Sequence, residues 1–185
     1  MDAISLIPTA ANDFGDRVHQ LKDDVWDHDT PCDEWTVRDL VNHLVYEQLW
    51  VPHLLRGETV QQVGDRYEGD MLGDDPVAAW DAAIEDALSS WLDFDRDQIV
   101  HLSFGDFPAS DYADQVLMDL VVHGWDLSRG ADLDDHMDAD GVAHSLVFAR
   151  ANAAMLTGSG AFGTPQTAPT SDPQSQLLAL LGRKS

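Results

Sequence analysis

The sequence predicts an all-α protein, most simply a four-helix bundle with long connections between its helices. Apolar residues recur every three or four positions in five segments, which is the spacing of an amphipathic helix. Only one stretch, residues 97–110, has strand character, and it is short and interrupted by glycine. No internal repeat or change of composition divides the 185 residues, so we expect a single domain over residues 1–185.

The first two helices are predicted over residues 12–26 and 37–55. Thr36 is a good N-cap residue for the second helix, and Asp39, three positions on, places a carboxylate at the positive end of that helix. Gly57 is suited to end it. The first helix is predicted from the helical spacing of five apolar residues: Phe14, Val18, Leu21, Val25 and Trp26.

A third helix is predicted to begin at Asp75 and Pro76, because an aspartate followed by a proline is a common helix start. Its apolar side chains continue at helical spacing to residue 92. Two connections flank this helix. Residues 57–75 are polar and contain several glycines, which predicts a long loop, and residues 97–110 are predicted to be an extended connection rather than part of a sheet.

Two more helical segments are predicted in the C-terminal half. Ser110 or Asp111 is expected to cap a helix over residues 112–129 that ends at Gly130. A fifth amphipathic segment covers about residues 141–156. The following residues, from about 158 to 185, are rich in glycine, proline, serine and threonine, and they end in a short apolar turn. We therefore expect an irregular tail packed on the helical domain.

The composition excludes several classes of partner. The formal net charge is −24 at pH 7, with 34 acidic residues against only 10 lysines and arginines. Such a field repels phosphate backbones and anionic lipids, so we expect neither nucleic acid nor a membrane as a partner. Cys32 is the only cysteine, and the sequence contains no evident signal peptide or apolar membrane span. These features favour a reducing, cytoplasmic location.

Three side chains on two of the predicted helices form a candidate metal site. His43 lies beside the apolar stripe of the helix over residues 37–55 and so is turned toward the core. Asp119 and His123 lie one turn apart, so their Cβ atoms are about 5–6 Å apart on one helix face. Two histidines and a carboxylate are a usual ligand set for catalytic zinc, and they also suit ferrous iron or nickel. Facing helices of a bundle commonly supply such sites.

The residue patterns alone leave other interpretations open. In an acidic chain with eight histidines, an aspartate and a histidine one turn apart are often no more than a hydrogen-bonded pair. Asp126 is either a carboxylate that orients a ligand histidine or part of a solvated helix face. Cys32 precedes a helix, where a thiolate can be stabilised. Because the sequence shows no base beside Cys32, we favour a plain loop cysteine.

Two motifs, TPCDEWTVRDLVNHLV at residues 30–45 and DLVVHGWDLSRG at residues 119–130, resemble the DinB/YfiT-like superfamily. The branch concerned is the actinobacterial group similar to the N-terminal domain of mycothiol-dependent maleylpyruvate isomerase. The C-terminal segments GAFGTPQTAP and QLLALLGR resemble the ends of the short members of that group. The resemblance covers nearly the whole chain, and the two motifs in this order are more specific than either one alone.

The resemblance implies a DinB-like four-helix bundle that holds one divalent metal, commonly zinc. By their positions in the motifs, the implied ligands are His43, Asp119 and His123. The isomerase-like pattern has glutamate where this chain has Asp119, so Glu47, one turn after His43, is the alternative carboxylate ligand. The longer isomerases also carry a C-terminal domain with substrate-binding groups. We expect this chain to be too short for that domain, so maleylpyruvate isomerisation itself is not carried over.

The leading hypothesis is a divalent-metal-dependent enzyme that uses a low-molecular-weight thiol such as mycothiol, as a thiol transferase or a thiol-assisted isomerase. A zinc-type ion lowers the pKa of a bound thiol, and Ni²⁺ or Fe²⁺ are alternative metals. The competing hypotheses are a metal-binding bundle without catalysis and a metal-dependent hydrolase. The expected partners are a small-molecule substrate and the thiol. Bundles of this kind often form dimers, so a homodimer is one expected assembly.

Overall fold

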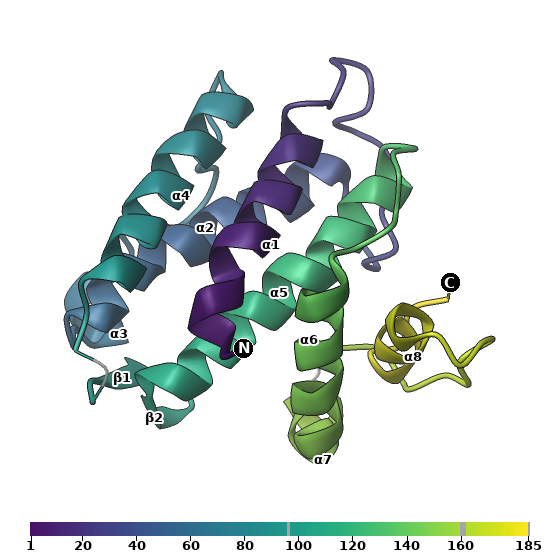
Figure 1. Ribbon diagram of the computed structural model, residues 1–185. Coiled ribbons are helices and arrows are strands. Elements are labelled where there is room, and N and C mark those ends of the chain that lie inside the picture. Colours follow the sequence, from purple (N-terminus) through teal and green to yellow (C-terminus); the bar gives the residue numbers. More distant parts are fainter. Residues whose placement is uncertain (96, 160–161, 185) are drawn as a thin grey trace.

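Four long helices form the body of the molecule. The computed structural model describes residues 1–95, 97–159 and 162–184 (Figure 1). Helix α1 packs on α4 and α5, and α2 packs on the same two helices, so the four close around one core. The fold is all-α and DinB-like, as the sequence predicts. The bounds of these helices are α1 (Ala3–Val18), α2 (Val37–Leu55), α4 (Pro76–Leu92) and α5 (Ala109–Gly130).

The residues predicted to cap the N-termini of α2 and α4 do so. The Thr36 side chain accepts a hydrogen bond from the Asp39 backbone, and the Asp39 carboxylate accepts one from the Thr36 backbone N–H at 2.9 Å. Asp75 caps α4, with Pro76 as its first residue. Gly57, with φ of +77°, follows the last turn of α2. These caps fix where α2 begins and therefore which of its side chains face α5.

The predicted bounds of the first helix are wrong. Helix α1 begins at Ala3, with Asp2 as its N-cap, and ends at Val18. The apolar residues that extend the pattern beyond Val18 lie in the following loop, where Val25 is buried and Leu21 and Trp26 pack partly buried against the core. Their helical spacing therefore reflects burial of a loop rather than a continuing helix.

Residues 97–110 form a hairpin, which corrects the expected extended connection. Strand β1 (Ile99–Leu102) pairs antiparallel with β2 (Gly105–Pro108), with Val100 opposite Phe107. Gly105 has φ of +147°, a conformation that other residues rarely adopt. The glycine that seemed to interrupt a strand therefore allows the tight turn. The long loop over residues 57–75 contains one short helix, α3 (Val60–Val63).

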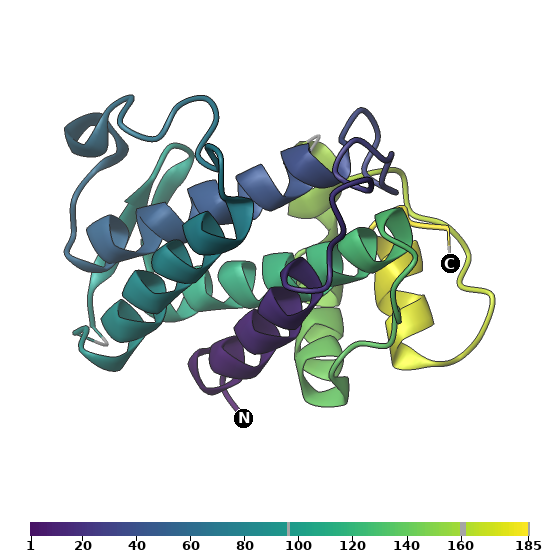
Figure 2. The ribbon, with the colours of Figure 1, turned by 90° about the horizontal axis from the view of Figure 1, so that it is seen from above.

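The C-terminal half is more regular than predicted. Helix α5 begins at Ala109, directly after β2, so neither Ser110 nor Asp111 is its cap. The predicted fifth segment is divided into α6 (Ala139–Ala151) and α7 (Ala153–Ser159). The tail contains α8 (Pro173–Leu180), capped by Asp172, where only a short apolar turn was expected. Figure 2 shows α8, in yellow, at the edge of the bundle, and it packs on α6.

Apolar side chains from the inner faces of the four long helices fill the core. Phe14 of α1, Leu40 and Leu44 of α2, and Leu117 and Leu120 of α5 are fully buried. Burial of such side chains stabilises each by about 1.5–3 kcal/mol relative to exposure. Within the described residues, no helix combines the length and the apolar character that crossing a membrane requires.

Candidate metal centre

Helices α2 and α5 bring the three predicted ligand residues together. Asp119 lies between the two imidazoles: one carboxylate oxygen is 3.3 Å from His43 Nε2, and the other is 3.3 Å from His123 Nε2. One donor atom from each of the three side chains lies within 4.8 Å of the other two. Asp119 and His123 share a face of α5 because they are one turn apart, and the His43 side chain points at that face from α2.

The spacing of these donor atoms suits a zinc-type ion. Donor atoms about 2.0–2.1 Å from a tetrahedral zinc ion lie about 3.3–3.4 Å from one another. Each Asp119–histidine distance is 3.3 Å and lies in this range, with a different carboxylate oxygen facing each imidazole. The shorter aspartate therefore still reaches both histidines. His43 and Asp119 are each about one quarter exposed, so a ligand has access to the site from one side.

Trp35 packs against both histidines. Its ring centroid is 4.8 Å from that of His43 and 5.8 Å from that of His123. Backbone hydrogen bonds hold the loop before α2 in place, including that from Thr30 N–H to the Trp35 carbonyl. A pocket of about 440 Å³ opens beside the site. Its lining residues are Glu34, Trp35, Asp39, Asn42, His43 and Tyr46.

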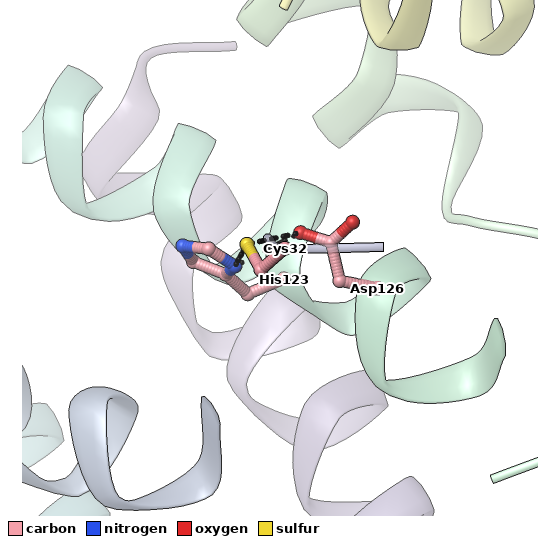
Figure 3. Close-up of side chains that lie close together, drawn as sticks. All are labelled: Cys32, His123 and Asp126. Carbon is pink, nitrogen blue, oxygen red and sulfur yellow. Dashed lines mark hydrogen bonds and ion pairs between the residues drawn. The ribbon is translucent and has the colours of Figure 1, made fainter. Parts of the chain in front are cut away.

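A second group of polar side chains supports His123 from behind (Figure 3). Asp126 is completely buried, and its Oδ2 lies 3.0 Å from His123 Nδ1. Two guanidinium nitrogens of Arg183 donate to the Asp126 carboxylate, at 2.8 and 3.3 Å. Cys32 Sγ is 3.5 Å from the same carboxylate and 3.8 Å from His123 Nδ1. Asp126 is therefore not part of a solvated helix face but orients His123.

Cys32, His123 and Asp126 also lie within 4.8 Å of one another, but they do not form a second cation site. Arg183 already supplies the positive charge there, with Nη2 at 2.8 Å from Asp126 and 3.3 Å from Cys32 Sγ. A divalent ion bound among the same atoms would lie against that guanidinium, and the repulsion between the two charges would oppose binding. We therefore interpret Cys32 and Asp126 as residues that hold His123 in place.

The buried charges of the site depend on one another. Burial by itself raises the pKa of Asp119, but the facing His123 and His43 outweigh burial and hold that pKa well below its usual range. Burial likewise opposes the charged form of His123, whereas Asp119, Asp126 and Cys32 raise the pKa of that imidazole well above 6.5. Without a metal, these contacts therefore favour the carboxylate form of Asp119 and the imidazolium form of His123.

Glu47 lies one turn after His43 but outside this cluster of donor atoms. Among the described residues, the group within 4.8 Å contains His43, Asp119 and His123 and not Glu47. Burial, and then the charge of Asp119, raise the pKa of Glu47 to about 7, although His43 and His123 partly offset them. Tyr112 of α5 is also buried near these carboxylates, and its hydroxyl finds no hydrogen-bond partner among the described residues.

Residues 7–128 match the model of a protein family, the mycothiol maleylpyruvate isomerase N-terminal domain. This chain belongs to that family. The match confirms the resemblance carried by the two sequence motifs and relates the chain to mycothiol and to metal-dependent, DinB-like proteins. No match is found among curated proteins or among solved structures. The matched range includes the three clustered residues but ends before the tail that carries Arg183.

Sequence reasoning missed three of the side chains that surround the site in this family member. Trp35 lies inside the first motif, but its position there does not signal contact with the two histidines. Cys32 was interpreted as a plain loop cysteine, yet it contacts His123 and Arg183. Arg183 lies 57 positions after Asp126, and no local pattern signals a contact over that distance. The only indication in the sequence is that Arg183 belongs to the segment QLLALLGR, which resembles the ends of the short members of the group.

The raised pKa of Glu47 predicts that the contribution of this group to the stability of metal-free protein falls as the pH rises. Between about pH 4.5 and 7 the unfolded chain releases the Glu47 proton while the folded protein keeps it, so the free energy of unfolding falls through that window. A shift of this size corresponds to at most about 3 kcal/mol. Urea unfolding of chelator-treated protein at about pH 5 and about pH 8 should show Glu47→Gln gaining roughly 1–3 kcal/mol on wild type between the two conditions.

The control for this measurement is Glu85→Gln, which removes the same charge from an exposed position on α4. It should differ from wild type by the same amount at both pH values. A Glu47→Gln variant whose stability difference is also the same at both values would show that burial of this carboxyl has no energetic effect.

Proposed function

We propose that this protein is a divalent-metal-dependent enzyme that uses a low-molecular-weight thiol such as mycothiol, as a thiol transferase or a thiol-assisted isomerase. The observation that carries the proposal is the position of Asp119, 3.3 Å from His43 Nε2 and 3.3 Å from His123 Nε2, beside an open pocket. Membership of a mycothiol-related family supports the choice of cosubstrate. Zn²⁺ is the metal that the donor set favours, with Ni²⁺ or Fe²⁺ as alternatives.

The proposed ligands are His43, Asp119 and His123. A zinc-type ion held there supplies one kind of chemistry: it lowers the pKa of a coordinated thiol so that thiolate is available at neutral pH. The protein contributes position and charge. Asp119 brings the negative charge that balances the cation, Asp126 orients His123, and Trp35 packs against the two imidazoles.

The pocket beside His43 favours a neutral or cationic substrate over an anionic one. Its lining includes two carboxylates, Glu34 and Asp39, and among the described lining residues there is no lysine or arginine. Nearby Arg38 is engaged with Asp70 at 2.8 Å. The formal net charge of −24 adds to the repulsion of anions.

Two further expectations, a cytoplasmic location and a homodimer, stay predictions.

The ligand assignment predicts about one divalent ion per chain in purified wild-type protein, and its loss in ligand variants. His43→Ala and His123→Ala should remove most of the metal, because each deletes a nitrogen donor. Asp119→Asn should reduce the affinity because it removes the charge that balances the cation, whereas Asp119→Glu should retain the metal. Elemental analysis of the folded variants measures this. If Glu47 is the carboxylate ligand instead, Glu47→Gln abolishes binding and Asp119→Asn does not.

The chain offers matched controls for this test. Asp114 and His144 form another ion pair, at 2.7 Å, that joins α5 to α6 away from the site. Asp114→Asn and His144→Ala should leave the metal content at the wild-type value. Wild-type metal content in folded His43→Ala and His123→Ala would show that the site is wrongly assigned.

The thiol hypothesis predicts that metal-loaded protein binds mycothiol and accelerates its reaction with an electrophile. Calorimetric titration should detect binding to the zinc-loaded wild type but not to chelator-treated protein or His123→Ala. With a fluorogenic electrophile, the initial rate of thiol consumption should be at least about tenfold higher with zinc-loaded than with chelator-treated protein. This corresponds to a barrier lower by about 1.4 kcal/mol.

The alternatives give different results in the same assays. A non-catalytic metal-binding bundle leaves the rate of thiol consumption unchanged. A metal-dependent hydrolase binds no thiol but cleaves an activated ester in a zinc-dependent reaction.

A further inference from the structure

Arg183, three residues after the end of α8, extends its side chain into the bundle and is 7% exposed. Its Nη2 and Nε donate to the two oxygens of Asp126, at 2.8 and 3.3 Å. Asp126 is itself fully buried, and its Oδ2 faces His123 Nδ1 at 3.0 Å. A continuous chain of contacts therefore runs from the C-terminal tail to the imidazole whose other nitrogen faces Asp119.

The backbone around Arg183 holds the guanidinium in one place. The Arg183 N–H donates to the Leu178 carbonyl at 2.8 Å, and Nη1 donates to the Leu181 carbonyl at 3.1 Å. Gly182 has φ of +84°, and a Cβ atom there would come within 2.6 Å of the Gly163 backbone. Only glycine fits this close approach of two tail segments. The turn at Gly182 thus aims Arg183 at α5.

We propose that Arg183 is a positioning residue of the candidate metal centre, acting through Asp126 on His123. The two guanidinium contacts prevent the Asp126 carboxylate from rotating away from the imidazole. A carboxylate facing Nδ1 keeps a hydrogen on that nitrogen, so in the neutral imidazole Nε2, the nitrogen beside Asp119, is the one free to bind a metal. The inference rests on the proposed function, because it gives Arg183 a role in holding the metal.

Arg183 comes from outside the part of the chain that defines the family match. The matched range ends at residue 128, whereas Arg183 is 57 positions after Asp126. In this protein the tail therefore completes a site built by α2 and α5. Arg150 of α6 shows the contrasting case, since it is exposed and hydrogen bonds to Gln176 of α8 without touching the site.

The test is the affinity for Zn²⁺, measured by competition with a chromophoric chelator on protein verified as folded by its melting temperature. Arg183→Gln should weaken Zn²⁺ binding about 10- to 100-fold, as loss of the histidine's own carboxylate partner does, because it frees Asp126 to turn away from His123. Arg183→Lys keeps the charge but not the paired donors, and it should weaken binding about tenfold. Arg150→Gln, which also removes a cation that contacts α8, should bind Zn²⁺ as wild type does.

A double-variant cycle separates positioning from mere attachment of the tail. If Arg183 acts through Asp126, Arg183→Gln changes the Zn²⁺ affinity less than about threefold in an Asp126→Asn background. Equal losses in both backgrounds would overturn the proposal, as would wild-type affinity in the folded Arg183 variants. His123→Ala in the same assay tests the centre itself: if it also binds Zn²⁺ normally, the proposed function fails, and if it alone loses Zn²⁺, only the positioning role is wrong.

Discussion

The arrangement of the site depends on one largely buried carboxylate that contacts two imidazoles. Asp119 joins α5 to His43 of α2 and also pairs with His123 on its own helix, each at 3.3 Å. Removing a carboxylate from water costs several kcal/mol, so it is stable in the bundle only when positive charge faces it closely. The His123 imidazolium, or one divalent ion between the two imidazoles, meets that requirement. In either case, the position of α2 relative to α5 depends on the positive charge that faces Asp119.

The small number of positively charged residues is the second constraint on the site. The chain has only 10 lysines and arginines against 34 acidic residues, yet it buries Arg17 and Arg183. Both contact the C-terminal half of α5: Arg17 donates to Ser128 at 2.7 Å, and Arg183 donates to Asp126. Two of the few cations thus fix the part of α5 that follows the ligand residues. A rigid helix there keeps His123 in a single orientation.

Local signals in the sequence predicted the parts of the fold and site that depend on neighbouring residues. The Thr36 and Asp39 capping box set the start of α2 correctly, and the one-turn spacing of Asp119 and His123 predicted their shared face. The parts that failed depend on distant contacts. Leu21 and Trp26 pack on the core from a loop, and Arg183 reaches Asp126 across the fold, so neither outcome follows from spacing along the chain.

X-ray absorption spectroscopy of the zinc-loaded wild-type protein is the most direct test of the ligand assignment, because it identifies and counts the atoms that coordinate the ion. Coordination by His43, Asp119 and His123 predicts nitrogen and oxygen neighbours at about 2.0–2.1 Å, with two imidazole rings, and no sulfur. Addition of mycothiol should introduce one sulfur neighbour at about 2.3 Å. A sulfur neighbour before any thiol is added would place the ion at Cys32 instead, and fewer than two imidazoles would contradict the assignment of His43 and His123.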